Sequence, residues 1–294
     1  MRLEIKFIII LLGWFFFTKP LIAQKTYPGP FKIIGKSLST IPQEVKGIAL
    51  YPLQHPNETL KFAGISLALI TIDKPTTKFT QRFFNHAFDV NFKNFIPVVS
   101  GRDDYIIGGI AALYAGSVVF KYEKGQIAAL AAVKATAYSV VYTHLILKSL
   151  TGRQRPHSDL NNPNFNDSPK TTNNWNFFNF HKPTLGGSQY GTAFPSYHIT
   201  YAFAVARAVE RTLHNTFFPY AFVITLNMMN FHGHAHWVSD MVAGAMVGHM
   251  IGTMATGGFK EKKLGKGYIK PHVSFAYNPY TLEQFPTFGL SYRF

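Results

Sequence analysis

The sequence predicts a mainly α-helical protein: a helical bundle of about six helices, with a short C-terminal β-hairpin. The 294 residues are 47% hydrophobic and 16% aromatic, so the chain can bury a large core. Apolar runs of helical length recur between Gly-, Pro- and Asn-rich segments across residues 59–258, and strand-like alternation follows in the tail. The expected helices cover residues 60–72, 105–120, 125–150, 196–215, 216–231 and 241–259.

Local signals support these helices in turn. Residues 60–72 form an apolar run that ends before Pro75, because proline stops a helix. Residues 105–120 carry no charge, and residues 125–150 are rich in Ala, the best helix former. The later helices follow the same pattern, and the segment from 196 to 215 has one apolar and one charged face.

The lengths of the apolar runs bear on membrane insertion. The uncharged runs are at or below the ~20 residues that span a bilayer. Charged residues interrupt two of the helices, among them Lys134, Arg207 and Glu210. We therefore expect a bundle that is mostly water-soluble or only shallowly embedded.

The two ends of the chain differ from the helical region. Residues 1–23 place Arg2 and Lys6 before a short apolar run and a small-residue end, which is the layout of a cleaved signal peptide. We therefore expect an exported, periplasmic and membrane-associated protein. Residues 24–58 are expected to be a polar segment with turn signals, and residues 259–294 a basic linker and a β-hairpin packed against the bundle.

A long irregular segment, residues 156–194, interrupts the helical region. Loops of this length are usually functional or disordered, and we expect this one to border the active site. It carries four aromatic residues: Trp175, Phe177, Phe178 and Phe180. Either these side chains pack on the base of the loop, or they contact an acyl chain or a membrane surface.

Composition restricts the chemistry. The 29 Lys and Arg residues outnumber the 14 Asp and Glu residues, which favours anionic partners such as phosphates, acidic lipid headgroups or nucleic acid. Cysteine is absent, which excludes disulfides, a thiolate nucleophile and a cysteine-based zinc site.

Two clusters of polar residues lie at helix ends. The stretch "KSLTGRQRP" places Lys148, Arg153 and Arg155 at a helix exit. The stretch "FPSYHIT" places Ser196, a suitable N-cap, and His198 at a helix start. Free backbone N–H groups at such a start favour an anion.

A third cluster lies in "NFHGHAHWVSD". If residues 232–240 are helical, His232, His236 and Asp240 share one face. An aspartate one turn from a histidine can fix the tautomer of the ring and raise its basicity. The HxxxH spacing of His232 and His236 also suits a zinc ion. His234 has no assigned role.

Together the three clusters resemble the motifs of the type 2 phosphatidic acid phosphatase and vanadium haloperoxidase superfamily. The resemblance spans roughly residues 60–258, with the motifs in the family's order and spacing. It implies a helical bundle in which the three motifs converge on one phosphate site. The matching positions are Lys148-x6-Arg155-Pro156, Pro195-Ser196-x-His198 and His236-x3-Asp240.

The resemblance implies a metal-independent phosphohydrolase that forms a phosphohistidine. His236 is then the nucleophile, Asp240 orients its ring, and His198 protonates the leaving oxygen. The implied phosphate-binding residues are Lys148, Arg155 and Ser196. No metal and no other cofactor is expected. The implied partners are a phosphorylated lipid, polyprenyl phosphate or small phosphoester substrate and an anionic membrane surface, and no nucleic acid is expected.

Two positions depart from the family pattern. Tyr197 replaces the glycine of the second motif, and Met229-Asn230 replaces the Ser-Arg pair of the third, which removes one phosphate-binding cation. Arg153 and a protonated His232 are candidates for supplying that charge. The departures leave open a non-catalytic descendant that binds anionic lipid. A zinc-dependent hydrolase and a vanadate-dependent haloperoxidase also remain open.

Overall fold

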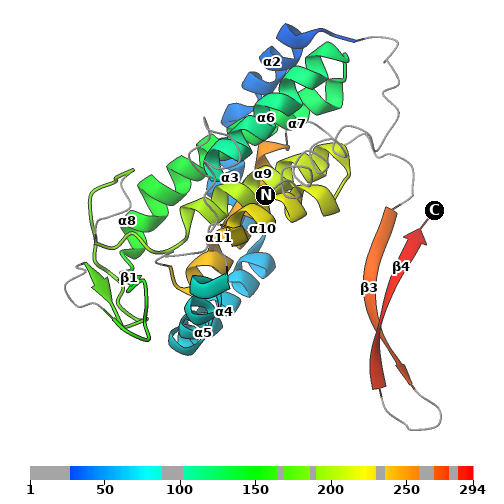
Figure 1. The fold of residues 1–294 in the computed structure, drawn as a ribbon. Helices are drawn as coiled ribbons and strands as arrows, with labels where there is room; N and C mark the ends of the chain where they lie inside the picture. Colours follow the sequence, from blue (N-terminus) through cyan, green and yellow to red (C-terminus); the bar gives the residue numbers. More distant parts are fainter. Residues whose placement is uncertain are drawn as a thin grey trace. The chain divides into compact units, whose positions relative to one another are not determined.

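Helices make up most of the larger of two units into which the chain divides, residues 1–258 and 259–294 (Figure 1). The expected mainly helical fold is confirmed. The expected signal peptide, residues 1–23, lies outside the residues that the computed structural model describes. The described residues are 27–87, 102–163, 169–185, 190–229, 236–257, 268–277 and 284–293.

All six expected helices are present. They are α4 (Pro56–Thr71), α6 (Arg102–Val119), α7 (Glu123–Ser139), α9 (Tyr197–Leu213), α10 (Phe217–Met229) and α11 (Val238–Ala255). The long Ala-rich helix does not stay regular: α7 continues as the π-helical segment η2 (Val140–Leu147) and ends in α8 (Lys148–Thr151). π-Helical turns are frequently found at functional sites, and this one leads directly into the first motif.

Three further helices were not predicted. The segment 24–58, expected to be polar and turn-rich, contains α2 (Pro30–Ser39) and α3 (Ile41–Gln54), and α5 (Asp73–Ala87) begins directly after α4. Pro30 and Pro56, which belong to the turn signals "YPGP" and "HPNET", lie in the first turn of a helix, where the missing N–H has no intrahelical partner to lose. Pro75, expected to stop a helix, likewise lies in the first turn of α5.

A buried ion pair joins the N-terminal helices to α7. The Nζ atom of Lys134 lies 2.6 Å from Oε1 of Glu44 and also donates to the Thr40 hydroxyl and the Ser37 carbonyl. The Tyr138 hydroxyl donates to the other Glu44 oxygen at 2.7 Å. Lys134 therefore interrupts the apolar run without exposing α7, because its charge is paired inside the bundle.

Helix α9 lies between two hydrophobic clusters. Tyr201, Ala202 and Val205 pack with residues of α6, α7 and α10, whereas Ala204 and Ala208 pack with residues of α3, α7 and α11. Three glycines let α11 approach α9 closely. A Cβ atom at Gly244, Gly248 or Gly252 would lie 2.2–2.7 Å from a carbonyl oxygen of Ser196 or of α9. This contact fixes the second motif against the third.

Two short sheets complete the described structure. Strand β1 (Arg155–Pro156) pairs in parallel with β2 (Lys170–Thr171). In the C-terminal unit, β3 (Tyr268–Tyr277) pairs antiparallel with β4 (Gln284–Arg293). The connecting residues, 278–283, lie outside the described part, and the expected packing of this unit on the bundle stays a prediction.

Of the helices that the structure describes, Glu123–Thr151 is long and apolar enough to cross a membrane. Its most apolar window is 44% buried inside the protein, and a buried core helix can have the same length and composition, so these alone are weak evidence for a span. The expected shallow embedding of the bundle stays a prediction.

The glycine contact predicts a paired result. Gly248→Ala should destabilise the protein by about 1–3 kcal/mol, because its Cβ would lie 2.2 Å from the Thr200 carbonyl oxygen in a packed interface. The control Gly64→Ala, on α4 with open space around it, should stabilise by up to about 1 kcal/mol through helix propensity. Urea unfolding measures both, and equal effects of the two substitutions would contradict the close contact.

Candidate active site

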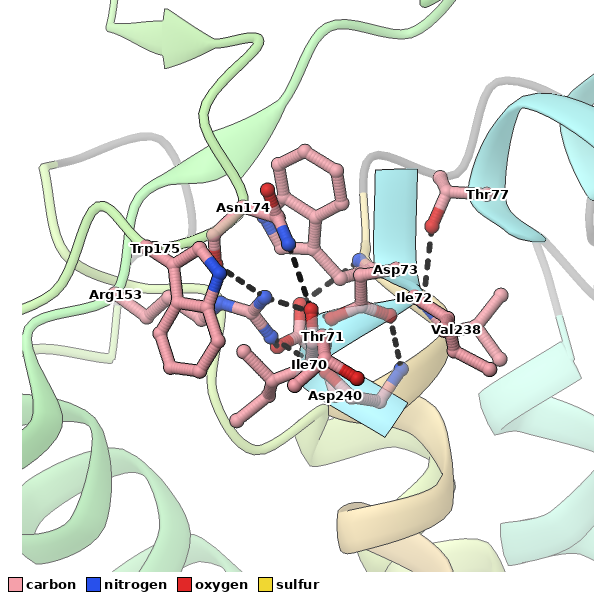
Figure 2. A network of polar contacts seen from close by, with 12 residues as sticks. Ile70, Thr71, Ile72, Asp73, Thr77, Arg153, Asn174, Trp175, Val238 and Asp240 are labelled. Carbon is pink, nitrogen blue, oxygen red and sulfur yellow. Dashed lines mark hydrogen bonds and ion pairs between the residues drawn. The ribbon is translucent and has the colours of Figure 1, made fainter. Parts of the chain in front are cut away.

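The centre of the site is the guanidinium of Arg153, which is fully buried and held by four acceptors (Figure 2). One terminal nitrogen donates to Asp240 Oδ1 at 2.7 Å and to Ser239 Oγ at 2.6 Å. The other donates to Asp73 Oδ2 at 2.7 Å and to the Asn174 carbonyl at 2.6 Å. The two ion pairs therefore join the first motif to α5 and to α11, and the hydrogen bond to the Asn174 carbonyl joins it to the long loop.

Further contacts close this network. The Ser239 backbone N–H donates to Asp73 Oδ1 at 2.8 Å, and its hydroxyl donates to the other oxygen of that carboxylate. The rings of Phe177 and Trp237 lie 4.7 and 5.3 Å from the Arg153 guanidinium carbon. Both terminal nitrogens of Arg153 are thus engaged with carboxylates and their neighbours, so Arg153 does not supply the phosphate-binding charge that position 230 lacks.

His236 and Asp240 form a buried pair, but not on one helical face. Helix α11 begins at Val238, so the assumption that the whole stretch up to Asp240 is helical is wrong for the two described residues before it. Asp240 is the third residue of α11, and its carboxylate faces the two residues that precede the helix. Its Oδ2 accepts from the Trp237 N–H at 2.9 Å and lies 3.3 Å from His236 Nδ1.

The protonation of Asp240 follows from this environment. The pKa of the carboxyl is raised to about 6, because burial, together with Asp73, outweighs the opposing effects of Arg153 and the Trp237 N–H. Asp240 is therefore ionised at neutral pH. In that state it accepts a proton from Nδ1 and leaves Nε2 of His236 as the nucleophilic nitrogen.

Two cations of the first motif lie beside this pair. Lys148 is 2% exposed, and its pKa is lowered to about 7 by burial and by Arg155, against an opposing effect of Asp240. Arg155 is half-buried, and its Nε donates to the Thr192 hydroxyl at 3.0 Å. Lys148 and Arg155 repel each other as neighbouring cations, and an anion between them would relieve that repulsion.

The second motif contributes a hydroxyl and a histidine. The Ser196 N–H donates to the Asp240 carbonyl at 2.9 Å, which fixes the start of α9 against α11. Ser196 precedes α9 as expected, but within the described chain its hydroxyl caps no helix N–H; the oxygen is buried without a hydrogen-bond partner. His198 Nε2 lies 3.5 Å from Asp103 and is partly exposed. Lys148, Arg155, Ser196 and His236 therefore lie around Asp240, whereas His198 is the second residue of α9 and faces Asp103.

Several predicted residues lie outside the described part: Asn230, His232 and His234. Among the residues that are described, no group of three His, Asp or Glu side chains is placed to hold a metal ion. Since His232 is not among them, the zinc interpretation is not tested.

The long loop packs closely on the first motif. Gly152 has a φ of 54°, and a Cβ there would lie 2.6 Å from the Asn179 backbone, so only glycine allows this approach. The Asn179 and Phe178 N–H groups donate to the carbonyls of Gly152 and Thr151. The aromatic set divides: Phe177 packs against Arg153, while the exposed members are Trp175, Phe178 and Phe180 at 49%, 73% and 68%.

Sequence interpretation missed Asp73 and His144. Asp73 had no local signal, because it is a single acidic residue at the start of α5, a helix that was not predicted. His144 lies four residues before Lys148 on the same helical rod, and that spacing could have identified it as a neighbour of the first motif.

Comparison with known proteins agrees with the motifs. Residues 127–263 match the PAP2 superfamily, which confirms the resemblance found in the sequence. No curated protein and no solved structure matches the chain.

The Arg153 network predicts a large loss of stability on removal of its cation. Arg153→Met should lower the free energy of unfolding by about 3–5 kcal/mol, because Asp73 and Asp240 would remain buried without their counter-ion. This loss of stability relative to wild type should become smaller as pH falls from 7 toward 5, because the buried carboxylates of the folded variant then take up protons that the unfolded chain does not bind. Urea unfolding at both pH values measures this.

A matched control is Arg207→Met, whose ion pair with Glu210 on α9 is partly exposed. That change should cost about 0–1 kcal/mol with little dependence on pH. An Arg153→Met loss no larger than that of the control would contradict the structural role of the network.

Proposed function

We propose that this chain, which belongs to the PAP2 superfamily, is a phosphohydrolase that works through a phosphohistidine without a metal ion. Phosphatase-type activity is what the family match indicates. The observation that carries the mechanism is the gathering of Lys148, Arg155 and the unpaired Ser196 hydroxyl beside the His236–Asp240 pair.

The first step is attack of His236 on phosphorus. Nδ1 faces Asp240, so the Nε2 lone pair forms the N–P bond while the bond from phosphorus to the ester oxygen breaks. His198 gives its proton to that oxygen, and the alcohol leaves. Water then attacks phosphorus, its proton passes to His198, and the N–P bond breaks to release phosphate. His198 returns to its starting protonation state, as a single acid–base residue must.

The binding residues act on the charge of the phosphoryl group. Lys148 and Arg155 are already in place before substrate arrives, so little reorganisation is needed in the transition state. The pKa of Lys148 is lowered to about 7, and a phosphate dianion would favour its charged form. The Ser196 hydroxyl donates to a phosphoryl oxygen and thereby gains the partner that it lacks among the described residues.

A lipid or polyprenyl phosphate outside the cytoplasm is the proposed substrate. Three aromatic side chains of the long loop are exposed, and the same loop is hydrogen-bonded to the segment that carries Lys148 and Arg155. Exposed apolar side chains next to a cationic site suit a substrate with a phosphate head and an apolar tail. The net charge of +15 suits an anionic membrane surface.

The phosphohistidine mechanism makes a direct prediction. Protein quenched in acid-free denaturant during turnover of a 32P-labelled phosphoester should carry label on His236 alone. His236→Ala should abolish turnover and labelling and keep the folded state, and Asp240→Asn should reduce the rate strongly by changing the tautomer. His249→Ala, on α11 and outside the cluster, serves as the control with unchanged turnover. Label on Ser196, or turnover by His236→Ala, would refute the mechanism.

The lipid proposal is tested by polar substitutions in the loop. Phe178→Ser together with Phe180→Ser should lower kcat/KM for phosphatidic acid in mixed micelles by about 10-fold or more, since each exposed ring loses roughly 1.5–3 kcal/mol of apolar burial on substrate binding. The same variant should leave hydrolysis of p-nitrophenyl phosphate unchanged. Phe177→Ser provides the contrast: the Phe177 ring packs on Arg153, so its loss should disturb the site and reduce the hydrolysis of both substrates. Equal losses on both substrates in the double variant would refute the lipid contact.

A further inference from the structure

His144 is a buried histidine to which neither the motifs nor the proposed mechanism gives a role. It lies on the π-helical segment η2, four residues before Lys148, and is 8% exposed. Its Nδ1 atom is fully buried and has no hydrogen-bond partner in the described part of the chain. Buried polar nitrogens are nearly always paired, so an unpaired one requires an explanation.

The surroundings of His144 are cationic. Lys148 of α8, Arg155 of β1 and His198 of α9 all act on the ring electrostatically, and each disfavours its protonation. The Thr184 backbone forms a hydrogen bond with the ring that acts in the opposite direction. His144 therefore borders the same cluster as the phosphate-binding residues and also contacts the long loop.

Tyr197 holds the ring in place. The centroid of its aromatic ring lies 4.3 Å from that of His144, and 5.4 and 5.3 Å from those of His198 and Tyr201, all in tilted arrangements. The family pattern has glycine at position 197, so this chain has both a bulky aromatic residue there and a histidine behind it. The same chain has Asn230 where the pattern has arginine.

We propose that His144 is an additional phosphate-binding residue, whose ring donates a hydrogen bond from Nδ1 to a phosphoryl oxygen and so replaces part of the charge missing at position 230. The inference rests on the proposed function, because it assumes that the cluster binds a phosphoryl group. An anion is the ligand that a buried, unpaired nitrogen among Lys148, Arg155 and His198 would accept.

The protonation of His144 then changes with the anion. Burial, followed by Lys148, His198 and Arg155, lowers the pKa of the ring to about 4 against the opposing hydrogen bond with the Thr184 backbone, so the ring is neutral at pH 7. A phosphate dianion neutralises the repulsion from these cations and raises the pKa of the ring. Anion binding should therefore take up a proton at His144, and affinity should increase as pH falls from 8 to 6.

The first experiment compares inhibition by orthovanadate in wild type and in His144→Gln. Glutamine keeps a polar side chain but takes up no proton, so the inhibition constant should rise about 10-fold at pH 6.5, the lower end of the effect of a charge-assisted hydrogen bond. The control is His249→Gln, a partly buried histidine of α11 whose pKa is also lowered but which lies outside the cluster. Its inhibition constant should not change.

The second experiment observes the ring itself in the wild-type protein. Histidine labelled with 15N reports the protonation of each ring nitrogen, and the His144 signals are assigned by their loss in His144→Gln. Addition of inorganic phosphate at pH 6.5 should move the Nδ1 signal of His144 toward the protonated position. This measurement does not depend on the folding of a variant, and a purely structural histidine would not respond.

The outcomes separate the two claims. If phosphate inhibits the wild-type enzyme while the His144 signals stay unchanged and His144→Gln retains full vanadate affinity, the inference is wrong and the proposed function stands. If wild-type protein neither hydrolyses phosphoesters nor binds phosphate or vanadate, the proposed function and the inference both fail.

Discussion

The site depends on one buried charge, the guanidinium of Arg153, shared between Asp73 and Asp240. These carboxylates belong to α5 and α11, which are far apart in the sequence, and the arginine belongs to the segment between α8 and β1. An unpaired charge buried at any of these positions would be strongly unfavourable, so the folded state requires all three segments to be in place. Because Asp240 also faces His236, the interaction that assembles the fold orients the proposed nucleophile as well.

Close helix packing supplies the second constraint. The Gly244, Gly248 and Gly252 stripe of α11 lies on the backbone of α9, so the Ser196 carbonyl and the start of α11 are held at contact distance. The hydrogen bond from the Ser196 N–H to the Asp240 carbonyl depends on this approach. Glycine is a poor helix former, and three of them in one helix are tolerated here because the tertiary contact outweighs the loss of propensity.

The sequence predicted the elements whose signal is local and missed those that depend on tertiary contacts. The six apolar helices have strong runs, and all six are found. Helices α2 and α3 carry prolines that indicate turns, and their contact with the bundle comes from Glu44 meeting the distant Lys134. In the site, the motif residues could be identified from their spacing. The roles of Asp73 and Arg153 could not, because one arginine near a helix end looks the same whether it faces solvent, phosphate or two buried carboxylates.

The departures from the family pattern become a connected set in the structure. A glycine at position 197 would leave the His144 ring without its aromatic neighbour, and Tyr197 is the residue that packs on it. With both terminal nitrogens of Arg153 committed to Asp73, Asp240 and their neighbours, the groups that we propose to bind a phosphoryl oxygen are Lys148, Arg155, the Ser196 hydroxyl and His144. Arginine holds its charge at every accessible pH, whereas histidine gains charge only when an anion or acid is present. The proposed replacement of an arginine by His144 would therefore retain phosphate binding but make its affinity dependent on pH.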